Sequence, residues 1–572
     1  MSNDYDAHAA ELREIQARHR PAGVPDAPVY PLGEISLPDH VSTWAQRRAD
    51  RPAIVFDTLT LTYADLDEKV KRVAGWLQAA GVTRGDRVAV HLPNCPQFVI
   101  TMLAVLRAGG VHVPVNPMFT ADEIAYELGD SGATVLLTAT ELWSQADSAL
   151  ERGEEVAVEQ VLMTSIMEMV GGAAEMPDGG GRSITPFATA LEHEPTDGVT
   201  PDLDALAALN YTGGTTGMPK GCEHSQRHML YTAASTATAT EESADTDFVA
   251  LCYLPIFWIA GEDLGILLPV VLGGTSVLMV RWDADTALTQ IERHKVTTMV
   301  GTVENYLEMA SREDISTRDL SSLERPMAVS FVRKMDPEVR RRWVEAVGEH
   351  SVLREASYGM TETHTMDTTP HGFQADDADL HEEPVFTGLP VPGTDILVVD
   401  WQDGHVLPLG EAGEIVVRSP SVTTGYWRKP EATAEQLRDG WLHTGDNGRI
   451  DERGRLHFLG RAKEMIKVKG MSVFPAELEM VIARHPSVGS CAVVPATDPA
   501  NGQRPVAFVT AAPGATVEVA DLEAHVRASL ASYKVPELIV LEEFPMTATG
   551  KIRKVELGEQ AQRAVDESRS AG

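Results

Sequence analysis

Short apolar strands alternate with amphipathic helices through the first part of this 572-residue sequence. Residues 59–63 alternate like a strand, residues 64–80 have the spacing of an amphipathic helix, and a buried strand is predicted at 87–92. A helix at 96–108 and a strand at 111–115 continue the series. Strands that alternate with helices usually pair in parallel, because each helix carries the chain back across the sheet. The pattern predicts an α/β fold with parallel sheets.

The sequence divides into regions of different pattern. A chain of this length exceeds what one hydrophobic core can hold, so at least two domains are expected. Residues 1–40 have several prolines and little pattern, and we interpret them as an N-terminal extension. Short strands dominate after residue 385, which predicts a small β subdomain at the end of a large domain over 41–461. Residues 462–572 predict a small α+β C-terminal domain, and residues 171–200 an exposed loop.

Composition narrows the class of protein. The net charge of −36 argues against a nucleic-acid partner, because phosphate backbones demand basic surfaces. Nothing approaches an apolar span of ~20 residues, so no transmembrane helix is expected. The acidic N-terminus lacks the basic-then-apolar order of a signal peptide. The four cysteines show neither zinc-ligand spacing nor a disulfide framework. Together these features predict a cytoplasmic protein without a dedicated transition-metal site.

A glycine-rich run at residues 211–221 reads Tyr-Thr-Gly-Gly-Thr-Thr-Gly-Met-Pro-Lys-Gly. Its glycines let backbone N–H groups approach an anion closely, its hydroxyls add donors, and its lysine adds a positive charge. Met218 and Pro219 stand where the mononucleotide P-loop pattern needs other residues. The run predicts a phosphate-binding loop of another kind, and the alternative is a flexible surface loop. The candidate phosphate ligands are Thr212, Gly213, Gly214, Thr215, Thr216, Gly217 and Lys220.

Three further motifs follow in order along the chain. Residues 357–362 read Ser-Tyr-Gly-Met-Thr-Glu, residues 440–446 read Gly-Trp-Leu-His-Thr-Gly-Asp, and residues 545–552 read Pro-Met-Thr-Ala-Thr-Gly-Lys-Ile. With the glycine-rich run, this series resembles the adenylate-forming enzymes, which include acyl-CoA synthetases, luciferases and the adenylation domains of peptide synthetases. The resemblance extends over nearly all of residues 59–554.

The resemblance implies a role for each matching residue. Tyr358 and Gly359 are expected at the adenine, Thr361 at the phosphates, and Glu362 with Thr215 at a Mg²⁺ ion. A hard carboxylate suits Mg²⁺ that is shared with ATP oxygens. The resemblance assigns Asp446, whose two oxygens suit a vicinal diol, to the ribose, and Arg461 to the ribose or a phosphate. Lys551 corresponds to the catalytic lysine that stabilises charge as the acid attacks the α-phosphate, and Lys220 is expected to assist.

The resemblance also implies that the C-terminal domain rotates between two half-reactions. Lys463 corresponds to the pivot, and hinges of this kind absorb large changes in φ and ψ at few residues. Rotation would replace Lys551 by a face that includes Lys467, Lys469 and Gly470, which corresponds to the CoA tunnel of CoA-forming members.

The chain departs from the family pattern near the expected substrate pocket. Many CoA-forming members have a histidine where this chain has Trp258. Glu262 and Asp263 follow where apolar residues are more usual, and are interpreted either as surface residues or as partners of a substrate amine. Arg333 and Lys334 replace a neutral turn, so they either add positive charge near the substrate carboxylate or point outward. The candidate pocket residues are Phe257, Trp258, Gly261, Asp263, Val303, Glu304, Arg333, Lys334 and Met360.

These features favour a cytoplasmic acid–CoA ligase that uses ATP, Mg²⁺ and CoA. A fatty or aryl-alkenoic acid is the favoured substrate, because the segment at 257–261 is mainly apolar. One alternative keeps adenylation without CoA: a diazotase that activates nitrite, a small oxyanion, for reaction with an aromatic amine. The other is an inactive nucleotide-binding scaffold, against which the intact Lys220, Glu362, Asp446 and Lys551 argue. A homodimer is the macromolecular partner left open.

Overall fold

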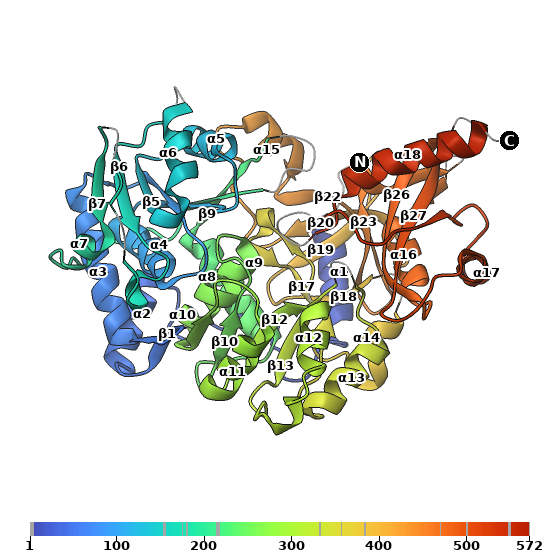
Figure 1. The fold of residues 1–572 in the computed structure, drawn as a ribbon, viewed down its shortest axis with the longest axis horizontal. Coiled ribbons are helices and arrows are strands. Elements are labelled where there is room, and N and C mark those ends of the chain that lie inside the picture. The colour runs from blue at the N-terminus through green and yellow to red at the C-terminus, as the bar shows by residue number, and fades with distance from the viewer. Residues whose placement is uncertain are drawn as a thin grey trace.

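The computed structural model describes residues 5–152, 156–173, 176–178, 181–212, 218–330, 333–355, 357–382, 385–468, 471–498, 502–546 and 551–570. Figure 1 shows a large body and a smaller C-terminal domain beside it. The predicted α/β class with parallel sheets is confirmed.

The first sheet of the body has seven strands. Neighbours in it are parallel except for the last pair, which is a hairpin. Val88 and Val90 face the core between the sheets, and Ala89 faces the outer side, which is the period of two that the sequence displays. In spatial order the strands are β7 (Ser183–Pro186), β6 (Gln160–Thr164), β5 (Val135–Ala139), β3 (Arg87–His91), β4 (Val111–Val115), β8 (Leu206–Tyr211) and β9 (Gly221–Ser225).

The second sheet of the body also has seven strands. It is parallel apart from one antiparallel edge pair. Ala250 and Cys252 face the core between the sheets, whereas Leu251 faces the outer side. In spatial order the strands are β14 (Arg354–Glu355), β13 (Arg325–Val329), β12 (Thr298–Thr302), β10 (Val249–Cys252), β11 (Thr275–Leu278), β1 (Pro52–Phe56) and β2 (Leu59–Thr62).

Helices fill the space between these two sheets and cover their outer faces. The inner helices are α2 (Leu37–Arg47), α3 (Tyr63–Ala79), α4 (Pro96–Ala108), α7 (Phe187–Leu191), α8 (Gln226–Ala239) and α10 (Leu268–Leu272). The outer helices are α5 (Ala121–Ser131) and α6 (Trp143–Arg152) on the first sheet, and α11 (Ala284–His294), α12 (Val303–Ala310) and α13 (Pro337–Val347) on the second. Every residue of α4 is buried, as its nearly all-apolar sequence requires.

A third sheet forms the predicted β subdomain. Its strands, in spatial order, are β17 (Thr368–Thr369), β18 (Val385–Pro390), β23 (Leu456–Arg461), β22 (Trp441–Ile450), β20 (Ala412–Arg418) and β19 (Asp395–Val399), with β21 (Leu437–Arg438) beside β22.

The sequence analysis missed a helix in the N-terminal extension, and its expectation of an exposed loop at 171–200 was wrong for part of that segment. Residues 1–40 contain a helix, α1 (Tyr5–Ala17), which lies beside β19 in Figure 1. Ala9 and Leu12 are buried against this subdomain, and Arg13 Nε donates to Asp395 Oδ1 at 2.6 Å. Part of the expected loop at 171–200 forms β7 and α7, because Phe187 is buried in the central core. Both segments pack through a few apolar residues that are widely spaced in the sequence.

The C-terminal domain is a sheet with helices on both faces, as predicted. Its strands are β25 (Met471–Val473), β24 (Ile466–Val468), β27 (Gly502–Ala511) and β26 (Val488–Asp498), with β28 (Glu537–Val540) beside β27. Helices α16 (Pro475–Ala483) and α17 (Val519–Ser529) pack on one face, and α18 (Lys554–Ser570) on the other. Helix α16 also contacts β18 and β23, which seats the domain against the body.

Short elements connect these parts. They are α9 (Ile259–Glu262), the π-helix η3 (Asp263–Leu267), β15 (Gly359–Met360), the 3₁₀-helix η5 (Thr361–Thr363), β16 (Thr365–Met366), α14 (Ala378–His381), α15 (Pro430–Gln436) and the 3₁₀-helix η7 (Ala462–Glu464), together with the 3₁₀-helices η1 (Thr140–Leu142), η2 (Glu168–Val170), η4 (Ile315–Thr317) and η6 (Ala375–Asp377). None of the described helices is long and apolar enough to cross a membrane.

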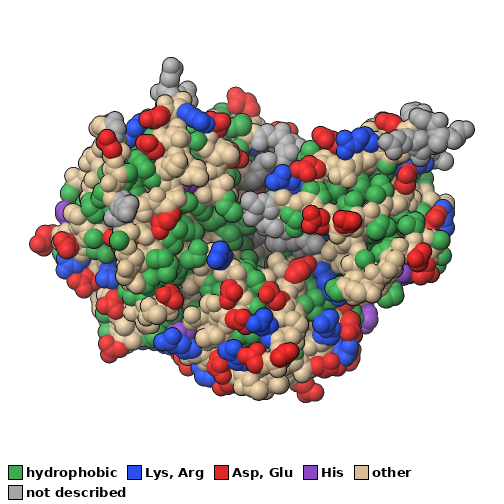
Figure 2. All heavy atoms as spheres, viewed as in Figure 1, with side chains coloured by type: hydrophobic (Ala, Val, Ile, Leu, Met, Phe, Trp, Pro, Cys, Tyr) green, Lys and Arg blue, Asp and Glu red, His purple; other side chains and the backbone are tan. Residues whose placement is uncertain are grey.

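The surface agrees with the charge of the sequence. On the face shown in Figure 2, basic side chains are interspersed with acidic ones, and a recess separates the body from the C-terminal domain. Hydrophobic side chains gather along the body's wall of that recess.

Candidate active site

The glycine-rich run closes the β8–β9 hairpin. Thr212 N donates to Lys220 O at 2.9 Å, so the two ends of the run lie side by side. Tyr211 Oη donates to Asp130 Oδ2 at 2.8 Å, and Tyr126 Oη donates to Pro219 O at the same distance. Both anchors lie on α5, which fixes the base of the turn to the outer layer. Gly213, Gly214, Thr215, Thr216 and Gly217 lie outside the described residues.

Lys220 and Glu362 meet at one aromatic residue that the sequence analysis did not select. Lys220 Nζ lies 4.3 Å from the centroid of the Tyr426 ring, and Tyr426 Oη donates to Glu362 Oε1 at 2.7 Å. Thr423 N also donates to Glu362 O at 2.7 Å. The segment at 423–426 therefore holds both predicted charges. Its Thr-Thr-Gly-Tyr sequence was the available signal, since it places a fixed aromatic after a turn.

Tyr358, Asp446 and Arg461 come together on the β subdomain. Asp446 and Arg461 are register partners of β22 and β23, and Arg461 Nε lies 3.8 Å from Asp446 Oδ1. Tyr358 Oη donates to Asp446 Oδ2 at 2.8 Å, and its ring packs at 5.7 Å against Phe458. Burial raises the pKa of Asp446 to about 6, although the Tyr358 hydroxyl partly offsets this. This carboxylate has one oxygen oriented by Tyr358 and one turned toward Arg461, which fits a ribose diol.

A small hairpin presents the second motif. Gly359 and Met360 in β15 pair with β16, and Thr361 and Glu362 form the 3₁₀ turn between them. His224 Nε2 donates to Thr361 O at 2.9 Å from beneath, and burial lowers the pKa of His224, which keeps the ring neutral. Met360 is half-buried against the subdomain core. The motif's backbone is thus held by a buried side chain on β9.

Lys551 reaches the body from the C-terminal domain. Its Nζ lies 5.9 Å from the centroid of the Trp258 ring, on the body's wall of the recess. The surrounding protein lowers the pKa of Lys551, and the Arg461 guanidinium lowers it further. Residues far apart in sequence are therefore electrostatic neighbours: Arg461 acts on both Asp446 and Lys551, and Glu362 acts on Asp446.

The candidate pocket residues separate into two groups. Phe257, Trp258, Gly261 and Asp263 line one continuous turn of chain, in which the Phe257 and Trp258 rings meet edge-on at 5.6 Å. A Cβ on Gly261 would lie 2.1 Å from Pro255 O, so only glycine fits. Asp263 is buried, and so is its neighbour Glu262, which rules out the interpretation of these acids as surface residues.

The second group lies elsewhere. Val303 is buried in the outer core of the second sheet, and Glu304 is exposed. Arg333 N donates to Glu304 Oε1 at 2.9 Å, and Lys334 Nζ donates to Ser330 O at 3.2 Å. The positive charge of Lys334 also helps to lower the pKa of Glu479, on helix α16. Lys334 therefore faces the C-terminal domain.

The predicted hinge lies where the body ends. Lys463 belongs to η7, which joins β23 of the body to β24 of the C-terminal domain. Lys467 is exposed on β24, and its backbone N donates to Gln503 Oε1 at 2.7 Å. Lys469 and Gly470 lie outside the described residues.

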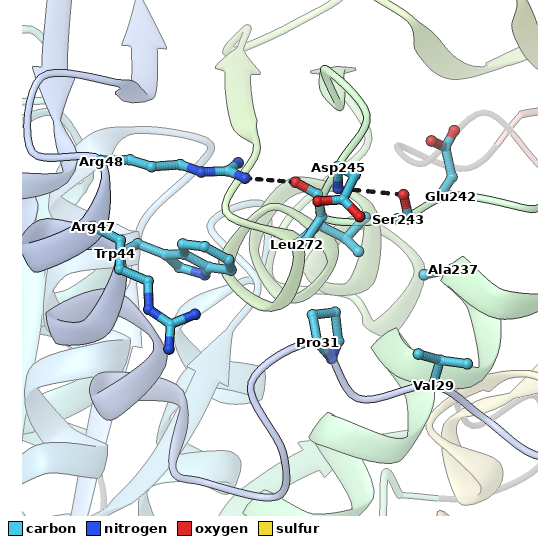
Figure 3. Close-up of a pocket in the computed structure, with 11 residues that line it drawn as sticks. Val29, Pro31, Trp44, Arg47, Arg48, Ala237, Glu242, Ser243, Asp245 and Leu272 are labelled. Carbon is cyan, nitrogen blue, oxygen red and sulfur yellow. Dashed lines mark hydrogen bonds between the residues drawn. The ribbon is translucent and has the colours of Figure 1, made fainter.

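A separate pocket of about 320 Å³ opens on the body, at the C-terminal end of α8 (Figure 3). Trp44, Arg47 and Arg48 of its wall come from the end of α2, and Arg48 Nη2 donates to Ala244 O at 2.8 Å. Its lining shares no residue with the recess described above.

Comparisons with known proteins agree with this arrangement. The model of the AMP-binding enzyme family matches residues 41–427, and that of the AMP-binding enzyme C-terminal domain matches residues 477–551. A long-chain-fatty-acid–CoA ligase of Bacillus subtilis (strain 168) is 31% identical over 547 residues, covering 93% of this chain and 95% of that protein. A feruloyl-CoA synthase of Amycolatopsis sp is 33% identical over 522 residues, covering 90% and 98%.

Solved structures give the same result. A crystal structure of an anthranilate CoA ligase in complex with anthranoyl-AMP superposes with a TM-score of 0.79 at 25% identity, covering 95% of this chain and 99% of that one. The two family models include the glycine-rich run, the motif at 357–362 and residues 545–551 of the last motif. The chain belongs to the AMP-binding enzyme family, within the acyl-CoA ligase branch of the adenylate-forming enzymes.

Proposed function

We propose that this enzyme activates a carboxylic acid with ATP and transfers the acyl group to CoA. The observation that carries the proposal is the position of Lys551, which crosses from the C-terminal domain to the wall of the recess at Trp258. A lysine ammonium there faces the segment that would hold the acid. Lys220 and Glu362 meet at Tyr426, and Glu362 is an electrostatic neighbour of Asp446, which raises the pKa of that carboxyl.

In the first half-reaction an oxygen of the substrate carboxylate attacks the α-phosphorus, and pyrophosphate leaves. Lys551 would stabilise the negative charge that builds between the carboxylate and the α-phosphate, which is often the largest catalytic contribution. Asp446 would accept both ribose hydroxyls, and Tyr358 would pack at the adenine. Glu362 and Thr215 would hold Mg²⁺ bound to the triphosphate, and Lys220 would neutralise the leaving phosphates.

In the second half-reaction the CoA sulfur attacks the acyl carbon, and AMP leaves as its phosphate oxygen–carbon bond breaks. Rotation at Lys463 would remove Lys551 and bring the strand with Lys467 to the recess. Because η7 is the short connection between the domains, a change in few backbone angles there would turn the whole C-terminal domain.

Fatty and aryl-alkenoic acids are the first substrates to test, because the relatives named above act on long-chain fatty acids and on ferulate. The nitrite-activating alternative required Arg333 and Lys334 beside the reacting atoms. The backbone of Arg333 is bonded to the exposed Glu304, and Lys334 faces α16, so no contact of the described residues favours that alternative.

The test follows AMP release and thioester formation with a panel of acids, with and without CoA. Acid-dependent ATP–pyrophosphate exchange followed by CoA-dependent thioester formation is the expected result. AMP release that requires nitrite and does not depend on CoA would overturn the proposal. Absence of ATP–pyrophosphate exchange with every acid would favour the inactive-scaffold alternative.

A further inference from the structure

A buried polar cluster lies deep to Trp258, and no step of the proposed reaction uses it. It consists of Asn210 on β8, Glu262 and Asp263 at the junction of α9 and η3, and His364 after the 3₁₀ turn of the Thr361–Glu362 motif. All four side chains are more than nine-tenths buried, and Glu262 and His364 have no exposed surface. We refer to these four residues as the amine cluster, for the reason given below.

The amine cluster contains more acceptors than the protein satisfies. Asn210 Nδ2 donates to Glu262 Oε2 at 3.1 Å, and Thr236 Oγ1 donates to Asp263 Oδ2 at 3.3 Å. Within the part of the chain that the structure describes, five other atoms have no hydrogen-bond partner: Asn210 Oδ1, Glu262 Oε1, Asp263 Oδ1 and both ring nitrogens of His364. Two of them, Glu262 Oε1 and His364 Nε2, lie 3.7 Å apart and face each other. A buried polar group without a partner destabilises the fold, so such groups in native proteins usually have a use.

The geometry points one end of the substrate at this cluster. Trp258 is the N-cap residue of α9 and Glu262 is its last residue, and Glu262 N donates to Trp258 O at 2.8 Å. One helical turn of about 5.4 Å therefore separates the two residues along the chain. For an acid whose carboxylate lies at Lys551 and Trp258, Glu262 is the next carboxylate along this segment.

Two local features mark the segment as specialised. Asp263 opens the π-helix η3, and π-helical turns are rare and occur frequently at functional sites. His364 has a φ of 57°, the left-handed conformation, at the C-terminal cap of η5. Both features turn polar side chains into a region that is otherwise part of the apolar core.

We propose that the amine cluster binds a primary amino group on the acid substrate, so that the enzyme selects amino-substituted carboxylic acids. This inference rests on the proposed function, since it names the substrate class of the same site. The unpaired atoms include three oxygens, all acceptors, and an amino group supplies several N–H donors at one atom. Burial raises the pKa of Glu262 to about 8 and that of Asp263 to about 7, and a nearby ammonium group would favour the ionised carboxylates.

The test compares matched acids on the wild-type enzyme. The pairs are 4-aminocinnamate against cinnamate and 6-aminohexanoate against hexanoate, with 4-hydroxycinnamate as a further comparison. We expect kcat/KM for thioester formation to be at least tenfold higher for the amino acid of at least one pair, with 4-hydroxycinnamate below 4-aminocinnamate. Equal or reversed preference in both pairs, or a higher value for the hydroxyl compound, would overturn the inference.

A second measurement uses Glu262→Gln and Asp263→Asn, which keep the side-chain shape. We expect each to lower kcat/KM for the preferred amino acid at least tenfold, mainly through KM, while the value for its unsubstituted partner stays within threefold. Glu242→Gln, which removes a buried carboxylate at the far end of α8, should leave the ratio between the pair unchanged. Equal losses on both members of the pair would show a structural role and overturn the inference.

The two proposals can fail separately. If the wild-type enzyme forms thioesters from unsubstituted acids as well as from amino acids, the amine inference fails and the ligase function stands. If no acid of the panel yields a thioester while nitrite supports AMP release, the proposed function fails, and the inference fails with it. Thermal unfolding of each variant shows whether a loss of activity reflects a loss of folded protein.

Discussion

The two sides of the recess satisfy their polar groups differently. On the nucleotide side, which comprises Tyr358, Glu362, Tyr426, Asp446 and Arg461, hydroxyls orient the two carboxylates through hydrogen bonds of 2.7 to 2.8 Å. On the acid side, which comprises Trp258 and the amine cluster, five buried atoms have no partner among the described residues. We propose that the nucleotide side is preorganised for ATP, with its carboxylates already oriented by hydroxyl groups. The acid side carries the features in which this chain departs from the family pattern.

The largest expected effect is on adenylate formation, the first half-reaction, alone. Lys551→Ala should slow adenylate formation by ~10²-fold or more, because one preorganised charge is removed from the transition state. Thioester formation from a supplied acyl-adenylate should change little. Single-turnover assays of each half-reaction measure both. Lys467→Ala is the matched variant and should show the opposite pattern, while equal losses in both half-reactions would contradict the two-state assignment.

The next effect concerns ATP affinity. Asp446→Asn should weaken ATP binding by roughly 10- to 100-fold, since charge-assisted hydrogen bonds are each worth about 1.5–3 kcal/mol. In the wild type, affinity should rise as pH increases through about 6, because only the ionised carboxylate accepts both diol hydrogens. Calorimetric titration with ATP between pH 5 and 8 checks this. An unchanged affinity in the variant would place the ribose elsewhere.

Glu262, on the acid side, should make the free energy of unfolding depend on pH. The pKa of Glu262 is raised from 4.5 to about 8 in the folded protein, so the unfolded state ionises first as pH rises. The contribution of Glu262 to stability is therefore full below pH 4.5 and is lost as pH rises through 8. As pH rises over this range, the free energy of unfolding should fall by about 1–3 kcal/mol less in Glu262→Gln than in the wild type. Denaturant unfolding of both proteins at pH 5 and pH 8.5 measures it, and parallel pH profiles would show that Glu262 is not the titrating group.

A smaller effect is expected where the nucleotide side is already paired. Tyr426→Phe keeps the ring beside Lys220 and removes only the hydroxyl that donates to Glu362. The loss of one hydrogen bond to a charged group should reduce kcat/KM for ATP by roughly 10-fold, or about 1.5 kcal/mol. Tyr426→Leu removes the ring as well and should lose more. If the two variants behave alike, the ring contributes nothing beyond its hydroxyl.

The smallest effect is expected for the pair that once suggested a different reaction. Arg333→Ala and Lys334→Ala, separately, should change kcat/KM for the acid by less than about 3-fold, because surface charges contribute under 1 kcal/mol. Lys334→Ala should show the larger change, since Lys334 faces Glu479 of the C-terminal domain. A collapse of activity in either variant would put that residue beside the reacting atoms and reopen the nitrite alternative.

Local patterns were sufficient for much of the fold. The helix at 96–108 and the strand at 111–115 match the structure to the residue, because continuous apolar runs bounded by proline and glycine have few other solutions. Helix α1 was missed because it is stabilised by docking on the β subdomain, through Arg13 and four apolar side chains, and not by a strong pattern of its own. The segment at 183–191 was missed for the same reason.

The sequence by itself determined the family, the order of its motifs and the residues that we propose for phosphate and ribose binding, because each motif is a short run whose chemistry is local. Only the tertiary structure decided which side chains meet. Tyr426 joins Lys220 to Glu362 across the body, and Lys551 reaches Trp258 from another domain. The structure also buried Glu262 and Asp263, which the sequence left between surface and pocket. Burial depends on the layers that pack around a residue, and the sequence of a single helix turn such as 259–262 does not indicate which elements cover it.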